Sequence, residues 1–333
     1  MRAWVCREYK HPYEIGIEEL AIPEPGTGQV LIEVAAAGLA FGETLVLKGS
    51  YQVTPPLPYV PSSELSGVVR AVGAGVTRFR PGDAVIAFSI SISGGAMAEW
   101  TVMPEGFVFH KPSPINFLQA AALPINYWTS FNALTRRGQV KAGETVVVFG
   151  ATGGIGIAGI QIARAIGARV IAVGGDDGKL GKLAQLGADV VINHRTQDVR
   201  EEIKAATGGL GANVFLDPVG GDLFDTAMRA IAPGGRILVV GATSGRYGQP
   251  RAAVMLVKMI SVIGVEARLA IETTHGQGLA DFHEMLSWFE KGRLTPHVGA
   301  VLPFESAIEG FESLIARQHI GKTVLAVNPG LVN

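Results

Sequence analysis

A glycine-rich turn constrains this chain more than any other feature of its sequence. The apolar run Thr145–Phe149 leads directly into it, and Ile157–Ile166 follows with the composition of a buried helix. Glycines allow a tight turn and close approach of the backbone to a pyrophosphate, whose charge is stabilised by free amides and the positive end of the helix dipole. We therefore predict a dinucleotide-binding turn formed by Gly150, Thr152, Gly153, Gly154, Ile155 and Gly156.

The sequence around this turn alternates short apolar strands with helical periods. Strands that are apolar throughout and separated by helices indicate a parallel sheet covered on both faces, which is a Rossmann-type α/β domain. The predicted strands after Thr145–Phe149 are Val170–Val173, Val190–Ile192, Val214–Leu216 and Arg236–Val240, and the predicted helices are Ile155–Ile166, Lys179–Leu186, Asp198–Thr207 and Leu223–Ile231.

A chain of 333 residues is long enough for two domains. Residues 1–123 contain short β-runs punctuated by Gly and Pro and predict a β-rich domain, and residues 124–265 form the Rossmann domain. Residues 266–333 contain a helix with apolar positions at Leu279, Phe282, Leu286 and Phe289. This tail needs a neighbour to cover it, and we expect it to return to the β-rich domain.

Charge and composition exclude several functional classes. The 28 basic and 29 acidic side chains nearly cancel, and no run of five like charges would attract nucleic acid or anionic lipid. No signal-peptide core and no stretch of eighteen apolar residues occurs, so we expect a cytoplasmic protein that acts on a small molecule. Cys6 is the only cysteine and the seven histidines are scattered, which predicts no metal site.

The end of the second strand bears on the choice between NAD and NADP. An acidic side chain at this point would bind the ribose hydroxyls of NAD, but Val170–Val173 is followed by Gly174 and Gly175, which leave room for a 2′-phosphate within reach of Lys179. Asp176 and Asp177 could bind the ribose if the strand ended later, or could cap the helix that begins near Lys179. The pattern favours NADPH.

With these pieces in order, the chain resembles the zinc-independent quinone oxidoreductase (zeta-crystallin-like) branch of the medium-chain dehydrogenase/reductase superfamily. The resemblance implies a GroES-like catalytic domain formed by both chain ends, a central Rossmann domain with the cofactor cleft between them, and homodimers joined through the edges of the Rossmann sheets at Val254–Val265. The motifs that carry it are Gly49-Ser50-Tyr51, Pro61–Val69, Pro81-Gly82-Asp83, Gly150–Gly156, Leu186–Asp189, Asp217–Gly221 and Gly321-Lys322.

The resemblance also implies roles for individual residues. Gly175, Lys179 and His194 correspond to residues around the 2′-phosphate, with His194 in place of the tyrosine of an Ile-Asn-Tyr-Arg-like motif. Thr129 lies near the nicotinamide, and Gly241, Ala242 and Thr243 pass the nicotinamide ribose. Tyr51 corresponds to a tyrosine that related enoyl-thioester reductases use, and it is our candidate hydrogen-bond donor to the substrate oxygen, although packing alone would also explain it.

These features predict an NADPH-dependent, zinc-independent reductase of quinones or α,β-unsaturated carbonyl compounds. One departure bears on this prediction, because Ala40 replaces the asparagine that many members of the branch carry. The change could abolish quinone turnover, shift the substrate preference, or be compensated by Asn126 or Asn132. A non-catalytic NADPH-binding protein with a structural, redox-sensing or RNA-binding role is the alternative. We expect Glu64 to bind backbone amides of the Pro61–Gly67 turn, and Cys6 and His110 to be packed side chains.

Overall fold

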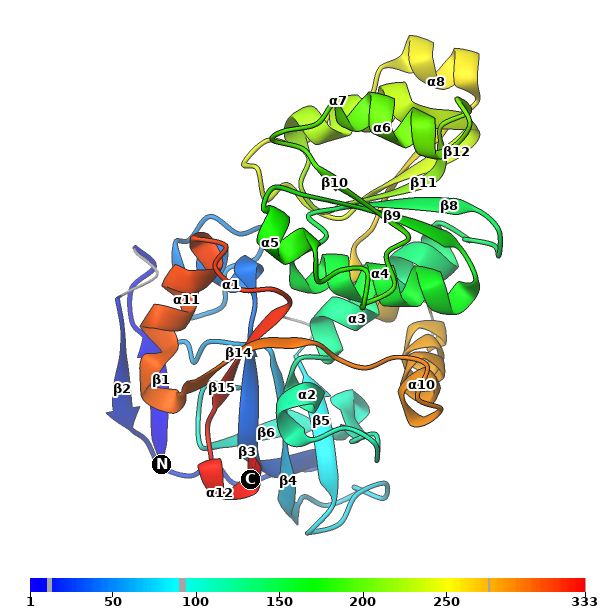
Figure 1. Ribbon diagram of the computed structural model, residues 1–333. Coiled ribbons are helices and arrows are strands. Elements are labelled where there is room, and N and C mark those ends of the chain that lie inside the picture. The colour runs from blue at the N-terminus through cyan, green and yellow to red at the C-terminus, as the bar shows by residue number, and fades with distance from the viewer. Residues whose placement is uncertain (11–13, 90–93, 275, 333) are drawn as a thin grey trace. The chain divides into compact units, whose positions relative to one another are not determined.

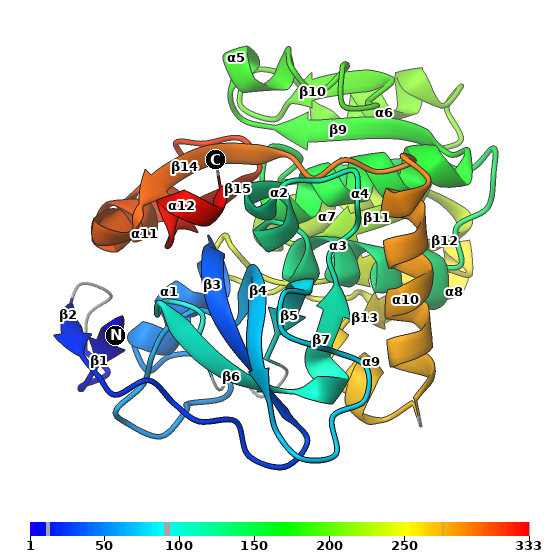
Figure 2. The same cartoon turned by 90° about the horizontal axis from the view of Figure 1, so that it is seen from below.

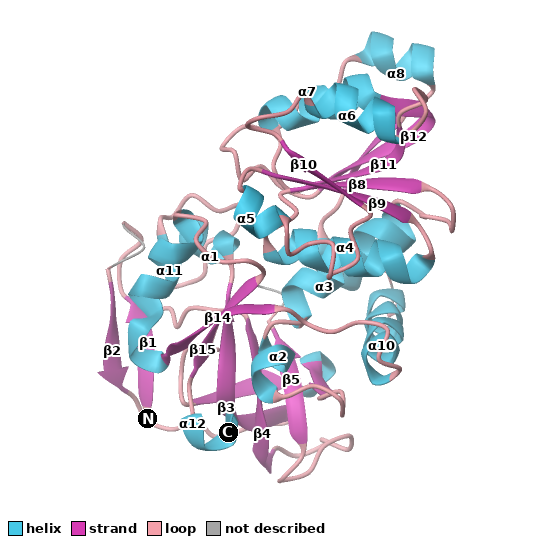
Figure 3. Cartoon of the chain, in the orientation of Figure 1, coloured by secondary structure: helices cyan, strands magenta, loops and turns pink. Residues whose placement is uncertain are grey.

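The computed structural model describes residues 1–10, 14–89, 94–274 and 276–332. The chain divides into two compact units, one comprising Met1–Ile125 and Thr295–Asn333 and the other Asn126–Leu294. Strands dominate the first unit, whereas helices and strands alternate in the second (Figure 3). The division at 125/126 falls within helix α3 (Pro124–Phe131), close to the boundary expected from the sequence.

The segment 266–294, which the sequence assigned to the returning tail, instead packs with the second unit. Its main helix is α10 (Gln277–Glu290), and α10 covers its apolar face with aromatic side chains of α3. The ring centroids of Phe289 and Tyr127 are 5.0 Å apart, and those of Phe282 and Trp128 are 5.8 Å apart. The apolar stripe was predicted correctly, but the surface that covers it is α3, so the chain returns to the first unit at Thr295.

The first unit is built around a seven-stranded sheet, in which six strands follow the order β14-β15-β3-β4-β5-β7 and β6 pairs with β3, and it also contains a separate β1-β2 pair (Figure 2). All pairs are antiparallel except β14 with β15. The strands are β1 (Arg2–Cys6), β2 (Ile15–Glu19), β3 (Gln29–Leu39), β4 (Glu64–Val72), β5 (Ala84–Phe88), β6 (Trp100–Pro104), β7 (Val108–His110), β14 (Val298–Pro303) and β15 (Lys322–Ala326). The helices are α1 (Phe41–Leu47), α2 (Phe117–Ala121), α11 (Ala307–Ile315) and α12 (Pro329–Val332).

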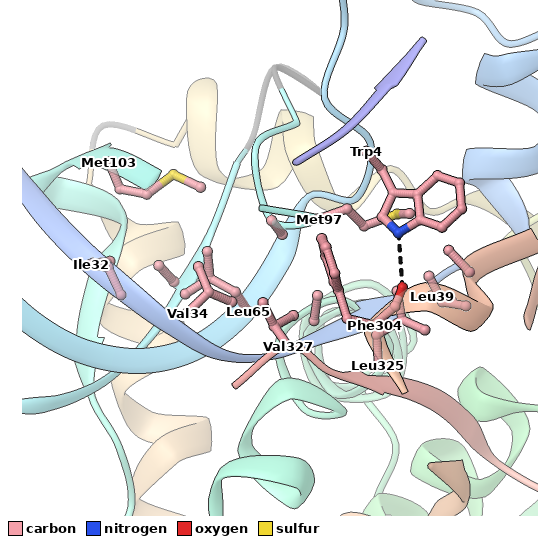
Figure 4. Packing of buried hydrophobic residues seen from close by; sticks show 14 of the residues in the cluster. Trp4, Ile32, Val34, Leu39, Leu65, Met97, Met103, Phe304, Leu325 and Val327 are labelled. Carbon is pink, nitrogen blue, oxygen red and sulfur yellow. Dashed lines mark hydrogen bonds between the residues drawn. The ribbon is translucent and has the colours of Figure 1, made fainter. Parts of the chain in front are cut away.

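The C-terminal segment completes the core of the first unit. Strand β15 pairs with the end of β3, placing Leu325 opposite Ala37. The Trp4 Nε1 donates a hydrogen bond of 2.8 Å to the Phe304 carbonyl oxygen, 300 residues later in the chain (Figure 4). Both side chains are almost fully buried in one apolar cluster, so the N-terminal strand and the returning segment exclude water from the same core.

The second unit contains a six-stranded parallel sheet in the order β10-β9-β8-β11-β12-β13. In this unit's own chain order the arrangement is 3-2-1-4-5-6, the doubly wound order of dinucleotide-binding domains. Helices α6 and α7 lie on one face of the sheet and α4 on the other (Figure 1). Because both faces are covered, Val146, Val147 and Val148 are fully buried, which explains the uninterrupted apolar run.

The strands and helices of this sheet agree closely with the sequence-based expectation. One exception is the helix expected over Lys179–Leu186, which ends at Leu180 and continues as turns, because Gly178 and Gly181 weaken a helix there. The strands are β8 (Thr145–Phe149), β9 (Arg169–Gly174), β10 (Val190–Asn193), β11 (Ala212–Asp217), β12 (Ile231–Val239) and β13 (Ser261–Gly264). The remaining helices are α4 (Gly154–Ile166), α5 (Asp177–Leu180), α6 (Val199–Ala206), α7 (Gly221–Ala230), α8 (Ala252–Lys258) and α9 (Ala267–Glu272).

Candidate cofactor and active site

The glycine-rich turn connects β8 to α4 at the point where the strand order of the sheet reverses. Gly150 has a φ of 58°, a left-handed conformation that favours glycine, and its carbonyl oxygen accepts a 2.9 Å hydrogen bond from the Gly153 amide. A Cβ on Gly156 would lie 2.4 Å from the Gly150 oxygen, so no side chain fits there. Gly153 caps α4 without a side-chain hydrogen bond, which leaves the first-turn amides for an anionic ligand.

Two further loops meet this turn at the carboxyl ends of β11 and β12. Asp217 ends β11 fully buried, and its Oδ1 accepts hydrogen bonds from the amides of Val219 (2.9 Å) and Gly220 (2.8 Å), while burial raises its pKa. The Thr243 amide donates to the Pro218 carbonyl oxygen, and a Cβ on Gly150 would lie 3.0 Å from Val219 Cγ2. The loop after Asp217 therefore contacts both the Gly150 turn and the segment Gly241–Thr243. Such a meeting of loops at the carboxyl ends of the strands is where the doubly wound fold binds its ligands.

The end of β9 brings two basic side chains together. A Cβ on Gly175 would lie 2.8 Å from His194 Nε2 and 3.0 Å from Arg195 Nε, so the absence of a side chain at Gly175 makes room for both. The His194 amide donates to the Gly174 carbonyl oxygen at 2.9 Å, which fixes the start of the loop after β10. Arg195 was not among the residues selected from the sequence, although it directly follows His194 in the motif that selected the histidine.

Both carboxylates that could have contacted an NAD ribose already accept hydrogen bonds, one from the same loop and one from the end of β10. Asp176 Oδ1 accepts a hydrogen bond of 2.9 Å from the Lys179 amide and caps α5. Asp177 Oδ1 accepts a hydrogen bond of 2.7 Å from Asn193 Nδ2. Helix α5 therefore begins at Asp177, and the capping role considered for Asp176 is the one observed.

Helix α3 packs beside the glycine-rich turn. Asn126 Nδ2 would lie only 2.0 Å from a Cβ on Gly154, and Ser130 Oγ donates a hydrogen bond of 2.9 Å to the Ile155 carbonyl oxygen. Thr129 lies between these two residues on the same helix and is 8% exposed. Asn132, the other amide considered as a replacement for Ala40, is 4% exposed. Asn126 is thus the amide that lies against the glycine-rich turn.

In the first unit, Tyr51 packs against the first turn of α1. A Cβ on Gly42 would lie 3.6 Å from Cε2 of the Tyr51 ring, and Tyr51 borders the apolar core while remaining partly exposed. Ala40 is the N-cap residue of α1 and makes no side-chain cap hydrogen bond. The asparagine missing from this sequence would therefore have stood at an N-cap position, where its side chain could accept a hydrogen bond from the helix.

Glu64 has partners other than the expected turn amides. Its carboxylate pairs with Lys322 of β15, and Oε2 accepts a hydrogen bond of 2.9 Å from the Ile125 amide. Glu64 is 1% and Lys322 3% exposed, so this is a buried ion pair that joins the two sequence segments of the first unit. The expectation that Glu64 binds amides of the Pro61–Gly67 turn is wrong, because the returning strand supplies a cation that local sequence could not reveal.

Glu43, on α1, is a second buried carboxyl group in this unit. Its Oε1 accepts a hydrogen bond of 2.7 Å from the Tyr59 hydroxyl, and it also accepts one from the Ser62 amide. Burial raises the pKa of Glu43 to about 7, although these hydrogen bonds and the Lys322 charge act to lower it. A carboxyl group with this pKa titrates near neutrality.

The two residues expected to be packed side chains differ in their surroundings. Cys6 is buried, its Sγ donates to the Glu8 carbonyl oxygen, and burial raises the pKa of its thiol. His110 is exposed, but its ring lies 4.9 Å from that of Phe79. Cys6 is therefore packed in the interior as expected, whereas His110 packs against Phe79 from the exposed end of the edge strand β7.

Models of known families match both units. Residues 26–113 match the alcohol dehydrogenase GroES-like domain, and residues 154–291 match a family described as zinc-binding dehydrogenase. These matches define the class of the fold, which combines a GroES-like domain with a parallel-sheet Rossmann domain, as the sequence predicted.

Comparison with individual proteins narrows this class. Human quinone oxidoreductase is 34% identical over 316 residues, which cover 95% of this chain and 94% of that protein. The crystal structure of Escherichia coli quinone oxidoreductase complexed with NADPH has a TM-score of 0.89 at 26% identity and covers 98% of this chain and 100% of that one. A structure described as an NAD-dependent alcohol dehydrogenase has a TM-score of 0.90 at 34% identity, with coverage of 98% and 100%. The chain belongs to the quinone oxidoreductase family of medium-chain dehydrogenases/reductases.

The zinc in the description of the second family requires a test against the residues of this chain. Over the described ranges, no group of three or more His, Cys, Asp or Glu side chains gathers in a way that could hold a metal ion. Of the two buried glutamates of the first unit described above, Glu64 pairs with Lys322 and Glu43 accepts a hydrogen bond from Tyr59. These residues do not fit a zinc centre, and we derive no step of the reaction through one.

Among the helices that the structure describes, none is both long and apolar enough to cross a membrane.

Proposed function

We propose that this protein is an NADPH-dependent reductase that transfers hydride to a quinone or an α,β-unsaturated carbonyl compound, without a protein-bound zinc. The observation that carries the NADPH assignment is the convergence of His194 and Arg195 on Gly175, at the end of β9. In the doubly wound fold this is the position of the adenosine ribose. A guanidinium can bind a phosphate through two parallel hydrogen bonds, which a free ribose hydroxyl does not match.

The partners of Asp176 and Asp177 support the same assignment. An NAD site places a carboxylate on the ribose hydroxyls at the end of the second strand, whereas here each aspartate already accepts a hydrogen bond from Lys179 or Asn193. Lys179, His194 and Arg195 would surround a 2′-phosphate beside Gly175. The pyrophosphate would lie on the amides of Gly153 to Gly156, and the segment Gly241–Thr243 would border the nicotinamide ribose.

When bound, the cofactor supplies a hydride to the substrate carbon. The chain's own residues would orient the substrate, exclude water and stabilise the oxygen on which negative charge develops. Tyr51 is the proposed donor to this oxygen, because its ring lies on Gly42 at the first turn of α1 and the residue remains partly exposed. Thr129 is proposed to position the nicotinamide, on the same helix as Asn126.

We further propose that the protein is a cytoplasmic homodimer joined through the β13 edges of two Rossmann sheets. Strand β13 ends the sheet and, among the residues that the structure describes, pairs on one side with β12; such an edge can pair with a second copy. The neighbouring α8 and its C-cap expose three large apolar side chains, Leu256 (80%), Val257 (82%) and Met259 (76%). An exposed apolar cluster beside an open sheet edge is typical of a protein interface.

The cofactor assignment can be tested by titrating NADPH and NADH into the protein and its variants. Arg195→Ala should weaken NADPH binding by about 10- to 100-fold, which corresponds to the roughly 1.5–3 kcal/mol of a hydrogen bond to a charged group, and should leave NADH binding unchanged. Arg200→Ala, on the exposed surface of α6, is the matched control. Equal affinities for NADPH and NADH in the unmodified protein would contradict the assignment.

The reaction is tested by following NADPH absorbance at 340 nm with a panel of quinones, enals, enones and enoyl thioesters. We expect oxidation of NADPH with at least one acceptor, and a loss of kcat with little change in NADPH affinity for Tyr51→Phe. Binding of NADPH without turnover of any acceptor would instead support the non-catalytic alternative.

A further inference from the structure

The side chain of Asn126 carries a buried amide group without a partner. Asn126 is 8% exposed, and over the ranges that the structure describes its side-chain amide takes part in no hydrogen bond. Buried polar groups in folded proteins are nearly always hydrogen-bonded, because an unpaired group loses its contact with water and gains nothing in return. The Asn126 amide therefore indicates a partner that the described part of the chain does not supply.

This amide group lies against the first residue of α4. A Cβ on Gly154 would lie 2.0 Å from Asn126 Nδ2 and 2.8 Å from its Cγ, so the Asn126 amide occupies the space that a side chain at position 154 would fill. Gly153 is the N-cap of α4 and Gly154 is the first of its 13 residues. The donor nitrogen of Asn126 is thus placed beside the amino terminus of a long helix.

Two hydrogen bonds hold α3 on α4, and the two helices lie side by side in Figures 1 and 2. Ser130 donates from its Oγ to the Ile155 carbonyl oxygen at 2.9 Å, and Tyr127 donates from its hydroxyl to Gln161 Oε1 at 3.1 Å. Residues four apart lie on the same face of a helix, which is why Asn126 and Ser130 both contact the first turn of α4. The position of the Asn126 amide is therefore fixed by the fold itself.

The backbone beside Asn126 indicates the chemistry of the missing partner. The amides of the first turn of α4, from Gly154 to Gly156, have no carbonyl acceptor within the helix, and the N-cap supplies no side-chain acceptor. Free amides at the positive end of a helix dipole bind phosphate groups. The oxygens of a pyrophosphate are all acceptors, so this group can accept hydrogen bonds from the backbone amides and from Asn126 Nδ2 together.

We propose that Asn126 is a side-chain ligand of the cofactor's pyrophosphate, with its Nδ2 donating to a phosphate oxygen that lies on the first turn of α4. This inference rests on the proposed cofactor site and adds a side chain to a subsite formed otherwise by backbone amides. The pyrophosphate is common to NADPH and NADH, so Asn126 strengthens the binding of both equally, whereas Arg195 distinguishes them. Asn126 then serves the cofactor and does not replace the amide missing at Ala40.

Titration of four nucleotides into Asn126→Ala tests the inference. ADP carries the diphosphate without the nicotinamide riboside, and adenosine 2′-monophosphate carries the 2′-phosphate without the diphosphate. We expect the affinities for NADPH, NADH and ADP to fall by the same factor, about 10- to 100-fold, as for the loss of one hydrogen bond to a charged group. The affinity for adenosine 2′-monophosphate should stay unchanged. Thr135→Ala is the matched control and should change none of the four, since Thr135 follows α3 and its Oγ1 donates to the Phe131 carbonyl oxygen.

The variant Asn126→Asp separates hydrogen bonding from packing. Aspartate has nearly the shape of asparagine and still fills the space beside Gly154, but its carboxylate has no hydrogen to donate and repels a phosphate. We expect Asn126→Asp to bind NADPH, NADH and ADP more weakly than Asn126→Ala does. If Asn126 only fills space, Asn126→Asp binds all three as the unmodified protein does, and the inference is overturned.

Two further results would contradict the inference. An unchanged ADP affinity in Asn126→Ala overturns it, even where NADPH and NADH lose affinity, because the amide would then contact the nicotinamide half of the cofactor. Faster hydrogen exchange of the α4 amides in nucleotide-free Asn126→Ala also overturns it, because weaker binding would then come from a loosened turn. Should Asn126→Ala fail to fold, Asn126→Asp decides.

The assignment of NADPH fails separately from this inference. Equal affinities of the unmodified protein for NADPH and NADH contradict that assignment, but a common loss of affinity for both in Asn126→Ala still supports the role of Asn126. Conversely, if Arg195→Ala weakens only NADPH and Asn126→Ala weakens neither dinucleotide, the NADPH assignment stands and the role of Asn126 is excluded.

Discussion

The buried Glu64–Lys322 pair should make replacement of one partner far more damaging than replacement of both. In Lys322→Met, the Glu64 carboxylate stays in a site where it is 1% exposed, loses its cation and keeps the hydrogen bond from the Ile125 amide. Removing one member of a buried ion pair costs about 3–5 kcal/mol, because the remaining charge is neither solvated nor paired. At about 1.4 kcal/mol for each factor of ten, the unfolded fraction of the first unit rises more than a hundredfold.

The double variant Glu64→Gln with Lys322→Met should recover most of this loss. Glutamine has nearly the volume of glutamate and can still accept the hydrogen bond from Ile125, so no charge is left buried. Arg7→Met is the surface control. The Arg7–Glu18 pair has side chains that are 66% and 32% exposed, and such pairs contribute about 0–1 kcal/mol.

Hydrogen exchange on peptides from β3, β4 and β15 is the appropriate assay, because two units need not unfold together and a single global transition would mix them. Protection in these strands should fall strongly in Lys322→Met, return in the double variant and change little in Arg7→Met. A single variant that loses less than about 1 kcal/mol, or a double variant no more stable than the single one, would refute the reasoning.

Four further predictions follow from individual contacts. Ala40→Asn should stabilise α1 by roughly 1 kcal/mol by supplying the missing N-cap acceptor, measured as slower exchange of the α1 amides, and a neutral or destabilising effect would show that the cap geometry is wrong. Because folding raises the pKa of Glu43 from 4.5 to about 7, its contribution to stability is fully present below pH 4.5 and is lost as pH rises through 7, by about 3 kcal/mol in total. Chemical denaturation of Glu43→Gln should therefore show a stability relative to the unmodified protein that increases from pH 5 to pH 8, and a constant difference would contradict the assigned pKa. Gly156→Ala should abolish NADPH binding while the sheet stays folded, because its Cβ would lie 2.4 Å from the Gly150 oxygen, and unchanged affinity in a titration would exclude this turn as the binding site. Leu256→Asp should convert the proposed dimer to a monomer in sedimentation velocity, whereas a dimer that persists would place the interface elsewhere.

Much of the second unit could be predicted from local sequence. The apolar run of β8, the glycines after it and the helix that follows each report a physical constraint that acts over a few residues: burial on both faces, a positive φ at Gly150 and close approach at Gly156. The helix after β9 was the exception. Its length was predicted from the spacing of apolar residues alone, which does not include the low helix propensity of Gly178 and Gly181.

The candidate site was harder to predict, because its residues meet through contacts that are distant in sequence. The sequence places Glu64 in a β-rich segment but does not show its partner. The cation that pairs with it is Lys322 of the returning strand, 258 residues away. Arg195 was missed although it adjoins His194, since only the folded loop shows that both side chains converge on Gly175. The partner of α10 was also misassigned, because an apolar stripe shows that a helix must be covered and not which surface covers it.

The sequence by itself determined the doubly wound sheet, the dinucleotide turn and the membership of a family, because each depends on short-range spacing of glycines and apolar residues. Only the tertiary structure decided that Asp176 and Asp177 accept hydrogen bonds from Lys179 and Asn193, that α10 belongs to the second unit, and that Glu43 lies in the core on Tyr59. Side-chain hydrogen bonds and buried charges depend on which segments the whole fold brings together, and that information is not present in any local pattern.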